Sequence, residues 1–325
     1  MGLFERKFRV GRIILGFFVL SVFLLLADNV SAERGASFAF NNGYRADDLD
    51  WNIAGDSSGD NPNILSELSW NDLKIYQAKA DGRVILDWFY LRGSIGYGWI
   101  LDGENQDSDY GADNRALEWS RSNNSADNGN VMDASVGMGY PFEPGPGWLR
   151  MTPLLGYSFH EQNLTMTNGE QTLSDSSISI PLFGISPSPV GPISGLNSTY
   201  ESNWKGPWAG IDLSIEASRS LNLFGSFEYH WANYEAEANW NLRTDFAHPK
   251  SFEHIANGKG IVVSGGGTYA IDKHWLISAN VDYQKWSTDA GTDRTFFSSG
   301  ATSITRLNEV NWSSFAALLG IVYRL

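Results

Sequence analysis

The chain has 325 residues and a formal net charge of −14, with 42% apolar and 14% aromatic side chains, 34 Gly and no Cys. This composition argues against a disordered chain, a collagen-like chain or a disulfide-stabilised scaffold. The excess of acidic residues argues against nucleic acid as a partner, because binding to phosphates needs a surplus of cations.

The N-terminal segment has the layout of a secretory signal peptide. A basic stretch at residues 6–12 precedes an apolar run at residues 13–26, and Val30-Ser31-Ala32 follows as a cleavage pattern. A membrane anchor is the alternative, but this run is shorter than the ~20 residues that span hydrocarbon. We therefore predict a signal peptide over residues 1–32 and an outer-membrane β-barrel over residues 33–325. The barrel domain has a net charge of −16, which attracts cationic partners.

The rest of the chain alternates apolar and polar residues, as strands that cross a membrane do. Phe89, Tyr97 and Trp99 share one face of such a strand, and the opposite face is polar or small. Lipid outside and a tightly filled lumen inside produce this pattern. A soluble sandwich is the alternative, but its loops are more nearly equal at the two ends. The predicted strands span residues 36–54, 63–80, 83–101, 131–142, 149–167, 207–218, 221–241, 255–270, 274–286 and 311–325.

The predicted connections alternate between tight and long, which is typical of outer-membrane barrels with short periplasmic turns and long extracellular loops. The tight turns are at residues 80–82, 143–147, 219–220 and 272–273, and the longer polar connections are at 55–62, 102–130, 168–206, 242–254 and 287–310. The sequence therefore predicts an all-β fold, a ten-stranded antiparallel transmembrane β-barrel with five long extracellular loops, in the bacterial outer membrane. Ten strands enclose a lumen too narrow for a general porin, so we expect the function to lie in the loops.

The order of several short segments resembles the omptins, a family of ten-stranded outer-membrane endoproteases and adhesins. These segments are Leu68-Ser69-Trp70, Ser94-Ile95-Gly96, Gly98-Trp99, Gln106 to Tyr110, Gly156-Tyr157 and Phe227 to Trp231. In omptins an Asp-x-Asp pair faces an Asp-x-His pair across an extracellular cleft, with a water between them. The resemblance therefore implies that Asp107 and Asp109 are catalytic candidates.

The orientation of Asp107 and Asp109 depends on a break in the strand before them. An unbroken strand would place both on the lipid-facing side, so Gly103 must mark a bulge if they point into a cleft. The alternative to a catalytic role is a solvated carboxylate cluster in an acidic loop.

The second half of the omptin site is missing from this sequence. Beyond Ala232 the alternation inverts, which predicts a β-bulge that turns the upper odd residues inward. We therefore expect Glu235, Glu237, Asn239 and Asn241 to bind substrate. The omptin Asp and His fall on Asn239 and Asn241, and an amide cannot take a proton from water.

The histidines of the sequence offer no clear replacement for that base. Asp245 and His248 are three residues apart, which places them on opposite faces of a strand, and Pro249 disfavours a continuing ladder. His230 lies two residues from Glu228 on the lumen side, where we expect a buried hydrogen-bonded pair.

Three functions remain open. The first is an omptin-like barrel with a degenerate protease site that acts as a surface adhesin or binds cationic peptides or host surface proteins. The second is an active endopeptidase with an altered dyad, and the third is a narrow channel. The resemblance also implies lipopolysaccharide as a structural or activating lipid, although residues 158–161 lack the arginine that omptins use there. We expect outer-membrane lipid as a partner, no other cofactor and no metal.

Overall fold

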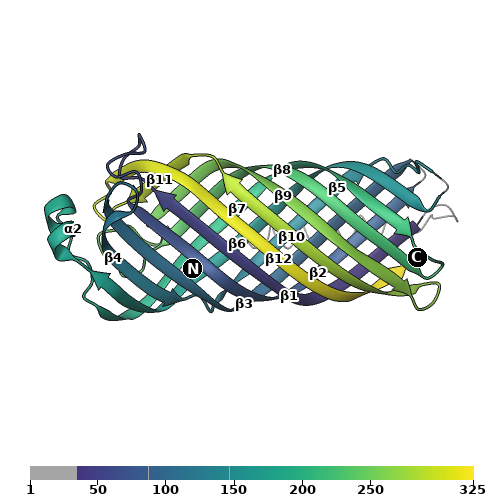
Figure 1. Ribbon diagram of the computed structural model, residues 1–325, viewed down its shortest axis with the longest axis horizontal. Coiled ribbons are helices and arrows are strands. Elements are labelled where there is room, and N and C mark those ends of the chain that lie inside the picture. The colour runs from purple at the N-terminus through teal and green to yellow at the C-terminus, as the bar shows by residue number, and fades with distance from the viewer. Residues whose placement is uncertain (1–34, 87, 146) are drawn as a thin grey trace.

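The protein is a closed antiparallel β-barrel, seen from the side in Figure 1. This computed structural model describes residues 35–86, 88–145 and 147–325, so the predicted signal peptide at residues 1–32 lies outside the described residues. The strands are β1 (Gly35–Ile53), β2 (Ser66–Leu86), β3 (Phe89–Ala112), β4 (Ala116–Ser125), β5 (Gly129–Gly139), β6 (Leu149–Ser174), β7 (Gly191–Glu216), β8 (Leu221–Asn239), β9 (Phe252–Ala270), β10 (Trp275–Thr288), β11 (Gly291–Phe296) and β12 (Thr302–Arg324).

At two places in the barrel wall, two consecutive strands lie end to end and together fill the place of one. β4 and β5 both pair with β3 and β6, and β10 and β11 both pair with β9 and β12. The described strands therefore form the ring of ten that the sequence predicts. β1 closes the ring against β12, with Ser37 opposite Arg324 at one end and Ile53 opposite Leu307 at the other. Closure leaves no long unpaired edge in the wall.

The two ends of the barrel differ. One end, the short-turn end, carries the connections β2–β3, β5–β6, β7–β8 and β9–β10. The other, the long-loop end, carries residues 54–65, 113–115, 175–190, 240–251 and 297–301. The predicted tight turns at residues 219–220 and 272–273 are confirmed, and the one at 143–147 falls in the β5–β6 connection, with residue 146 outside the described residues.

The predicted turn at residues 80–82 is wrong, because β2 continues through it to Leu86. Asp81 lies on the lumen side, where Asn41 donates a hydrogen bond to its carboxylate at 2.9 Å and the Lys79 ammonium lies 3.7 Å away. These partners satisfy the carboxylate inside the barrel and let the strand run on. The predicted loops at 102–130 and 168–206 are also mostly strand. Continued pairing satisfies backbone groups that would otherwise need other partners.

The outer wall carries a belt of exposed apolar side chains. Examples on neighbouring strands are Phe38, Phe40, Tyr44, Tyr76, Ile95, Trp99, Leu155, Tyr157, Phe227, Trp231, Val263, Tyr283, Phe315, Leu319 and Ile321. On β3 the belt ends at Leu101, and the next outward residues, Glu104 and Gln106, are polar and exposed. The strands reach 26 residues in length, whereas ~9–11 residues cross the hydrocarbon, so the wall projects well beyond the lipid.

The lumen is polar towards the short-turn end. Arg45 forms an ion pair with Asp47 at 2.7 Å and a second pair with Asp133, and Lys79 pairs with Asp282 at 3.0 Å. A cavity of about 260 Å³ lies among these groups. Buried charges of this kind are tolerated because each cation has carboxylate partners.

The lumen is apolar towards the long-loop end. Its largest side chains are at most 3% exposed and are Trp51, Trp70, Tyr200, Trp204, Tyr234, Trp286 and Trp312. This core fills the interior above the polar cavity, in keeping with the narrow lumen expected for ten strands.

A short helix, α2 (Ser176–Phe183), lies between β6 and β7 at the long-loop end, beyond the mouth of the barrel (Figure 1). Asp175 caps its N-terminus by accepting a hydrogen bond from the Ser177 amide, and Gly184 ends it in the left-handed conformation. Within the described part of the chain, no helical segment combines the length and apolar character that crossing a bilayer requires.

Candidate functional site at the long-loop end

β3 changes phase at Gly103, just beyond the lipid-facing belt. Below this point the even residue Ile100 is buried, whereas above it the odd residue Asn105 is buried. The pairing of β3 with β2 shifts at the same height, across residues 71–75. The bulge that the sequence requires at Gly103 is therefore present, and the upper odd residues of β3 face inward.

Asp107 and Asp109 share this inward face. Asp107 pairs in register with Leu68, a side chain of the apolar core. Asp109 lies between Ser66 of β2 and Ser120 of β4. The two carboxylates therefore lie on the inner wall of the projecting barrel, above the membrane and at the edge of the core.

The environment of the pair disfavours its full ionisation. Desolvation and the negative charge of Asp109 raise the pKa of Asp107 well above its ordinary value. Desolvation also raises the pKa of Asp109 to about 6, although hydrogen bonds with Ser66 and Ser120 and the charge of Arg243 act in the opposite direction. Near neutral pH the pair therefore retains proton affinity that an exposed Asp lacks.

The positive charge of Arg243 acts on this pair and lowers the pKa of both carboxyl groups. Arg243 lies in the β8–β9 connection, where its Nε and Nη2 donate to Asp245 at 2.9 and 2.8 Å. The guanidinium also lies 3.9 Å from the centre of the Phe246 ring. Arg243 is thus shared among several groups and does not neutralise the pair alone. Sequence reasoning missed it, because a lone basic residue in a loop carries no motif.

Asn241 has a structural role at the rim of the barrel. Its Oδ1 accepts hydrogen bonds from the Asn197 amide at 2.9 Å and the Ser198 hydroxyl at 3.1 Å. Its Nδ2 donates to the Gly195 carbonyl at 2.8 Å. These bonds hold residues 195–198 within β7, and they occupy the amide that was expected to bind substrate.

Asn239 contacts a histidine, but the arrangement does not provide a base. His248 Nδ1 lies 2.8 Å from Asn239 Oδ1, and His248 Nε2 lies 3.2 Å from the carbonyl oxygen of Arg243. The neighbours of the ring are an amide oxygen and a backbone carbonyl oxygen, so no carboxylate orients the ring as the Asp of the omptin Asp-x-His does. The pair therefore does not replace the missing Asp-x-His.

The prediction of a β-bulge near Ala232 in β8 is wrong. The register of β8 with β9 runs without a shift from Leu221 to Ala238. Glu235 and Glu237 consequently stay on the outer wall. There Lys205 donates a hydrogen bond to Glu235, and Lys250 donates one to Glu237, each at 2.7 Å. The two glutamates do not join Asp107 and Asp109 on the inner wall.

The inverted hydropathy of β8 has a different cause. Above the membrane the outward side chains meet water instead of lipid, and the inward ones meet an apolar core instead of the polar lumen. Tyr234, Ala236 and Ala238 are all at most 2% exposed on the inner face. The surroundings therefore change along β8 while the phase of the strand does not.

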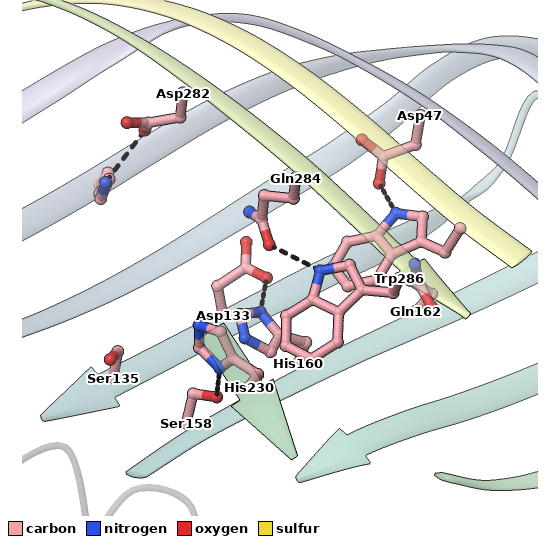
Figure 2. A network of polar contacts seen from close by, with 12 residues as sticks. Asp47, Asp133, Ser135, Ser158, His160, Gln162, His230, Asp282, Gln284 and Trp286 are labelled. Atoms are coloured by element: carbon pink, nitrogen blue, oxygen red, sulfur yellow. Dashed lines mark hydrogen bonds and ion pairs between the residues drawn. The ribbon is translucent and has the colours of Figure 1, made fainter. Parts of the chain in front are cut away.

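The remaining buried histidines belong to polar networks of the barrel interior. His230 Nε2 lies 2.9 Å from Glu228, which confirms the expected pair, and its Nδ1 lies 3.0 Å from the Ser158 hydroxyl (Figure 2). His160 Nδ1 lies 2.7 Å from Asp133 in the same region (Figure 2). These groups line the cavity near the short-turn end, away from the candidate pair.

A second network lies in the apolar core. The Tyr200 hydroxyl lies 2.6 Å from that of Tyr234 and 2.9 Å from His254 Nδ1, and His254 Nε2 lies 3.2 Å from Asp293. All four side chains are nearly fully buried. Among the residues that the structure describes, no group of three or more His, Cys, Asp or Glu side chains is arranged to hold a metal ion.

The closed ring, the lipid-facing belt and the long-loop end define a β-barrel protein of the bacterial outer membrane. The model of the Protochlamydia outer membrane protein family, Pom, matches residues 39–325, and the chain belongs to this family. No curated protein sequence matches the chain.

The outer membrane protease OmpT from Escherichia coli superimposes with a TM-score of 0.72 at 12% sequence identity, covering 92% of this chain and 99% of that chain. The translocator domain of the autotransporter NalP from Neisseria meningitidis has a TM-score of 0.37 at 9% identity, with 98% of each chain covered. The likeness to OmpT confirms the omptin-like fold, and at this identity it shows the fold alone.

Proposed function

We propose that the protein binds cationic peptide segments at the cell surface, with its long-loop end facing outward and with no proteolytic step. The observation that carries this proposal is the partly buried pair of Asp107 and Asp109 on the inner wall of the mouth. Its carboxyl groups have raised pKa values because burial leaves their charge incompletely compensated. An incoming guanidinium or ammonium group would supply that compensation and displace a proton that the pair retains.

The charge around the mouth supports the same ligand class. The connections of the long-loop end together contain five acidic and three basic residues, namely Asp56, Asp60, Asp113, Asp175 and Asp245 against Arg115, Arg243 and Lys250. The chain as a whole has 37 acidic and 23 basic residues, which steers cations towards it. A cationic peptide is therefore attracted over a distance and then held at a specific pair.

The geometry disfavours hydrolysis by the same site. Asn239 and Asn241 replace the omptin Asp and His, and His248 lies against the Asn239 amide and the Arg243 carbonyl oxygen rather than against a carboxylate. A raised carboxyl pKa alone does not provide the oriented base that activates water near neutral pH.

The test is a binding titration with the full chain refolded in detergent micelles. A fluorescent Arg-rich peptide is titrated at low ionic strength, and mass spectrometry follows whether it stays intact. We expect saturable binding without cleavage, weakened about tenfold or more by Asp107→Asn with Asp109→Asn. The matched control is Glu235→Gln with Glu237→Gln, which removes the same charge from the outer wall and should change the affinity less than about twofold.

Calorimetry adds an independent readout. At pH 6 the wild type should release protons on binding, seen as different heats in two buffers of unequal ionisation enthalpy, and the double Asn variant should not. Equal affinity of the two double variants would overturn the binding proposal. Turnover of the peptide that disappears in Asp107→Ala would establish an endopeptidase instead.

A further inference from the structure

Helix α2 lies at the end of the molecule farthest from the short turns (Figure 1), and exposed apolar side chains lie on and around it. Five aliphatic side chains, each at least 43% exposed, make up this surface, which we name the apolar tip: Leu117, Ile180, Leu182, Ile185 and Val190. Single exposed apolar residues are common, but a cluster of this kind marks an interaction site.

The barrel holds the apolar tip in place. Helix α2 contacts β3 and β4, and Phe183 packs against Trp119 of β4 with ring centroids 5.9 Å apart. Ser179, on the side of the helix that faces the barrel, is fully buried. One side of α2 is thus anchored. Leu182 borders Gly111 of β3 on that side and is still 51% exposed, and Ile180 is 52% exposed. Pro187 and Pro189 restrict the backbone between Ile185 and Val190, which limits the entropy lost on binding.

The tip has no charge in an acidic protein. Residues 176–200 contain no Asp, Glu, Lys or Arg, although charged residues make up 18% of the chain. An eight-residue helix leaves its first four amides and last four carbonyls without partners inside the helix, so α2 keeps backbone groups that need water or lipid headgroups. Shallow entry at the boundary of headgroups and acyl chains meets that need, and it requires no desolvation of a charged side chain in residues 176–200.

We propose that the apolar tip inserts into a lipid bilayer that lies opposite the long-loop end, one with zwitterionic headgroups. The net charge of −14 disfavours an anionic bilayer by repulsion. The exposed side chains of the tip include none of the aromatic or Arg residues that protein interfaces favour, which argues against a protein partner. Five side chains cover a few hundred Å², well below the ~800 Å² per partner of a stable interface, which argues against a second copy of this chain. This inference is independent of the proposed peptide site, because it involves neither Asp107 nor Asp109.

The test uses the absence of Cys, which makes a single introduced thiol unique. The full chain carrying Ser188→Cys is refolded into nanodiscs, labelled with an environment-sensitive dye and mixed with phosphatidylcholine vesicles. We expect a blue shift of the emission and co-flotation with the vesicles. A label at Ser57→Cys, on the exposed β1–β2 connection, should show no shift.

Substitutions then separate the tip from other exposed apolar residues. Ile180→Ser with Leu182→Ser should weaken co-flotation at least tenfold. Ile304→Ser, at a residue 51% exposed outside the tip, should leave it unchanged and shows that one exposed aliphatic residue is not enough. Phosphatidylglycerol vesicles should bind at least tenfold more weakly than phosphatidylcholine vesicles at low salt.

Three results would overturn the proposal. The first is no dye shift with phosphatidylcholine while the refolded barrel retains its native electrophoretic mobility. The second is unchanged flotation of the tip variant. The third is a shift that depends on protein concentration without vesicles, which would identify a second copy as the occupant.

Discussion

Trp286 of β10 and Trp312 of β12 stack inside the barrel, with ring centroids 5.5 Å apart and ring planes 18° apart. Trp204, from β7, reaches the same layer, 5.7 Å from Trp286. The layer borders the polar network, because His160 lies 4.8 Å from Trp286 (Figure 2 shows both). Aromatic rings from separate strands thus join the walls of the barrel between its polar cavity and its apolar core.

Replacing Trp286 by Ala should destabilise the barrel strongly. The side chain is 1% exposed and packs against several rings, so its removal leaves a cavity. This should lower the free energy of unfolding by about 3–5 kcal/mol. Urea unfolding in micelles, followed by tryptophan fluorescence, measures the loss. Leu117→Ala, at a side chain 53% exposed, should change the same quantity by less than about 0.5 kcal/mol.

The filled interior predicts that the wild type does not conduct ions. The core side chains Trp51, Trp70 and Tyr200 are at most 3% exposed and occupy the lumen above the cavity. Recordings from planar bilayers should show no discrete current steps at either polarity. Reproducible single-channel steps would contradict this prediction, because the packed side chains leave no open path through the core.

Arg45 should be among the residues least tolerant of substitution. It is 1% exposed and pairs with Asp47 and Asp133, so Arg45→Met leaves two buried carboxylates without their cation. Loss of one member of a buried ionic cluster costs about 3–5 kcal/mol. Lys74→Met, which breaks the exposed 2.6 Å pair with Asp102, should leave the urea midpoint nearly unchanged. Equal effects of the two substitutions would contradict the buried network.

Asp109 should make the protein less stable as the pH rises. Burial raises its pKa to about 6 from 3.8, so between these pH values the folded chain binds more protons than the unfolded chain. The free energy of unfolding therefore falls across this range and stays lower above it. Asp109→Asn should raise the urea midpoint at pH 7.5 and have little effect near pH 4.

Asp56 provides a control of opposite sign. Hydrogen bonds from Asn61 and from backbone amides lower its pKa, so its ionised form favours folding. Asp56→Asn should therefore not raise the midpoint at neutral pH. A rise in stability for both Asn variants at pH 7.5 would point to net charge rather than to the burial of Asp109.

Gly103 should resist even the smallest side chain. A Cβ there would lie 2.5 Å from Leu73 Cδ2 and 3.0 Å from the Ala126 carbonyl oxygen. Gly103→Ala should therefore cost about 1–3 kcal/mol and also weaken peptide binding, because the bulge orients Asp107. Gly145→Ala, where no atom lies within 4 Å, should change neither measurement.

The sequence allowed part of the candidate site to be predicted. The bulge at Gly103 followed from parity together with the inward orientation of Asp107 and Asp109 that the omptin resemblance implies, because residues two apart on a strand share a face. The pair of Glu228 and His230 followed from the same rule. The position of Glu235 and Glu237 on the outer wall could not be predicted in this way. An inverted alternation of apolar and polar residues can arise from a bulge or from a change in the surroundings of the strand. Only the unbroken register of β8 against β9 distinguishes them.

The sequence by itself determined the barrel, its ten wall positions and the places of three of its four tight turns, because the two-residue period and turn composition are local properties of the chain. The tertiary structure decided what each face meets at each height and which distant charges become partners. It joined Arg45 to Asp133, brought Arg243 near the carboxylates of β3, and placed an apolar core where a polar lumen was expected. These outcomes depend on closure of the ring, which brings strands far apart in the chain across a lumen only a few side chains wide.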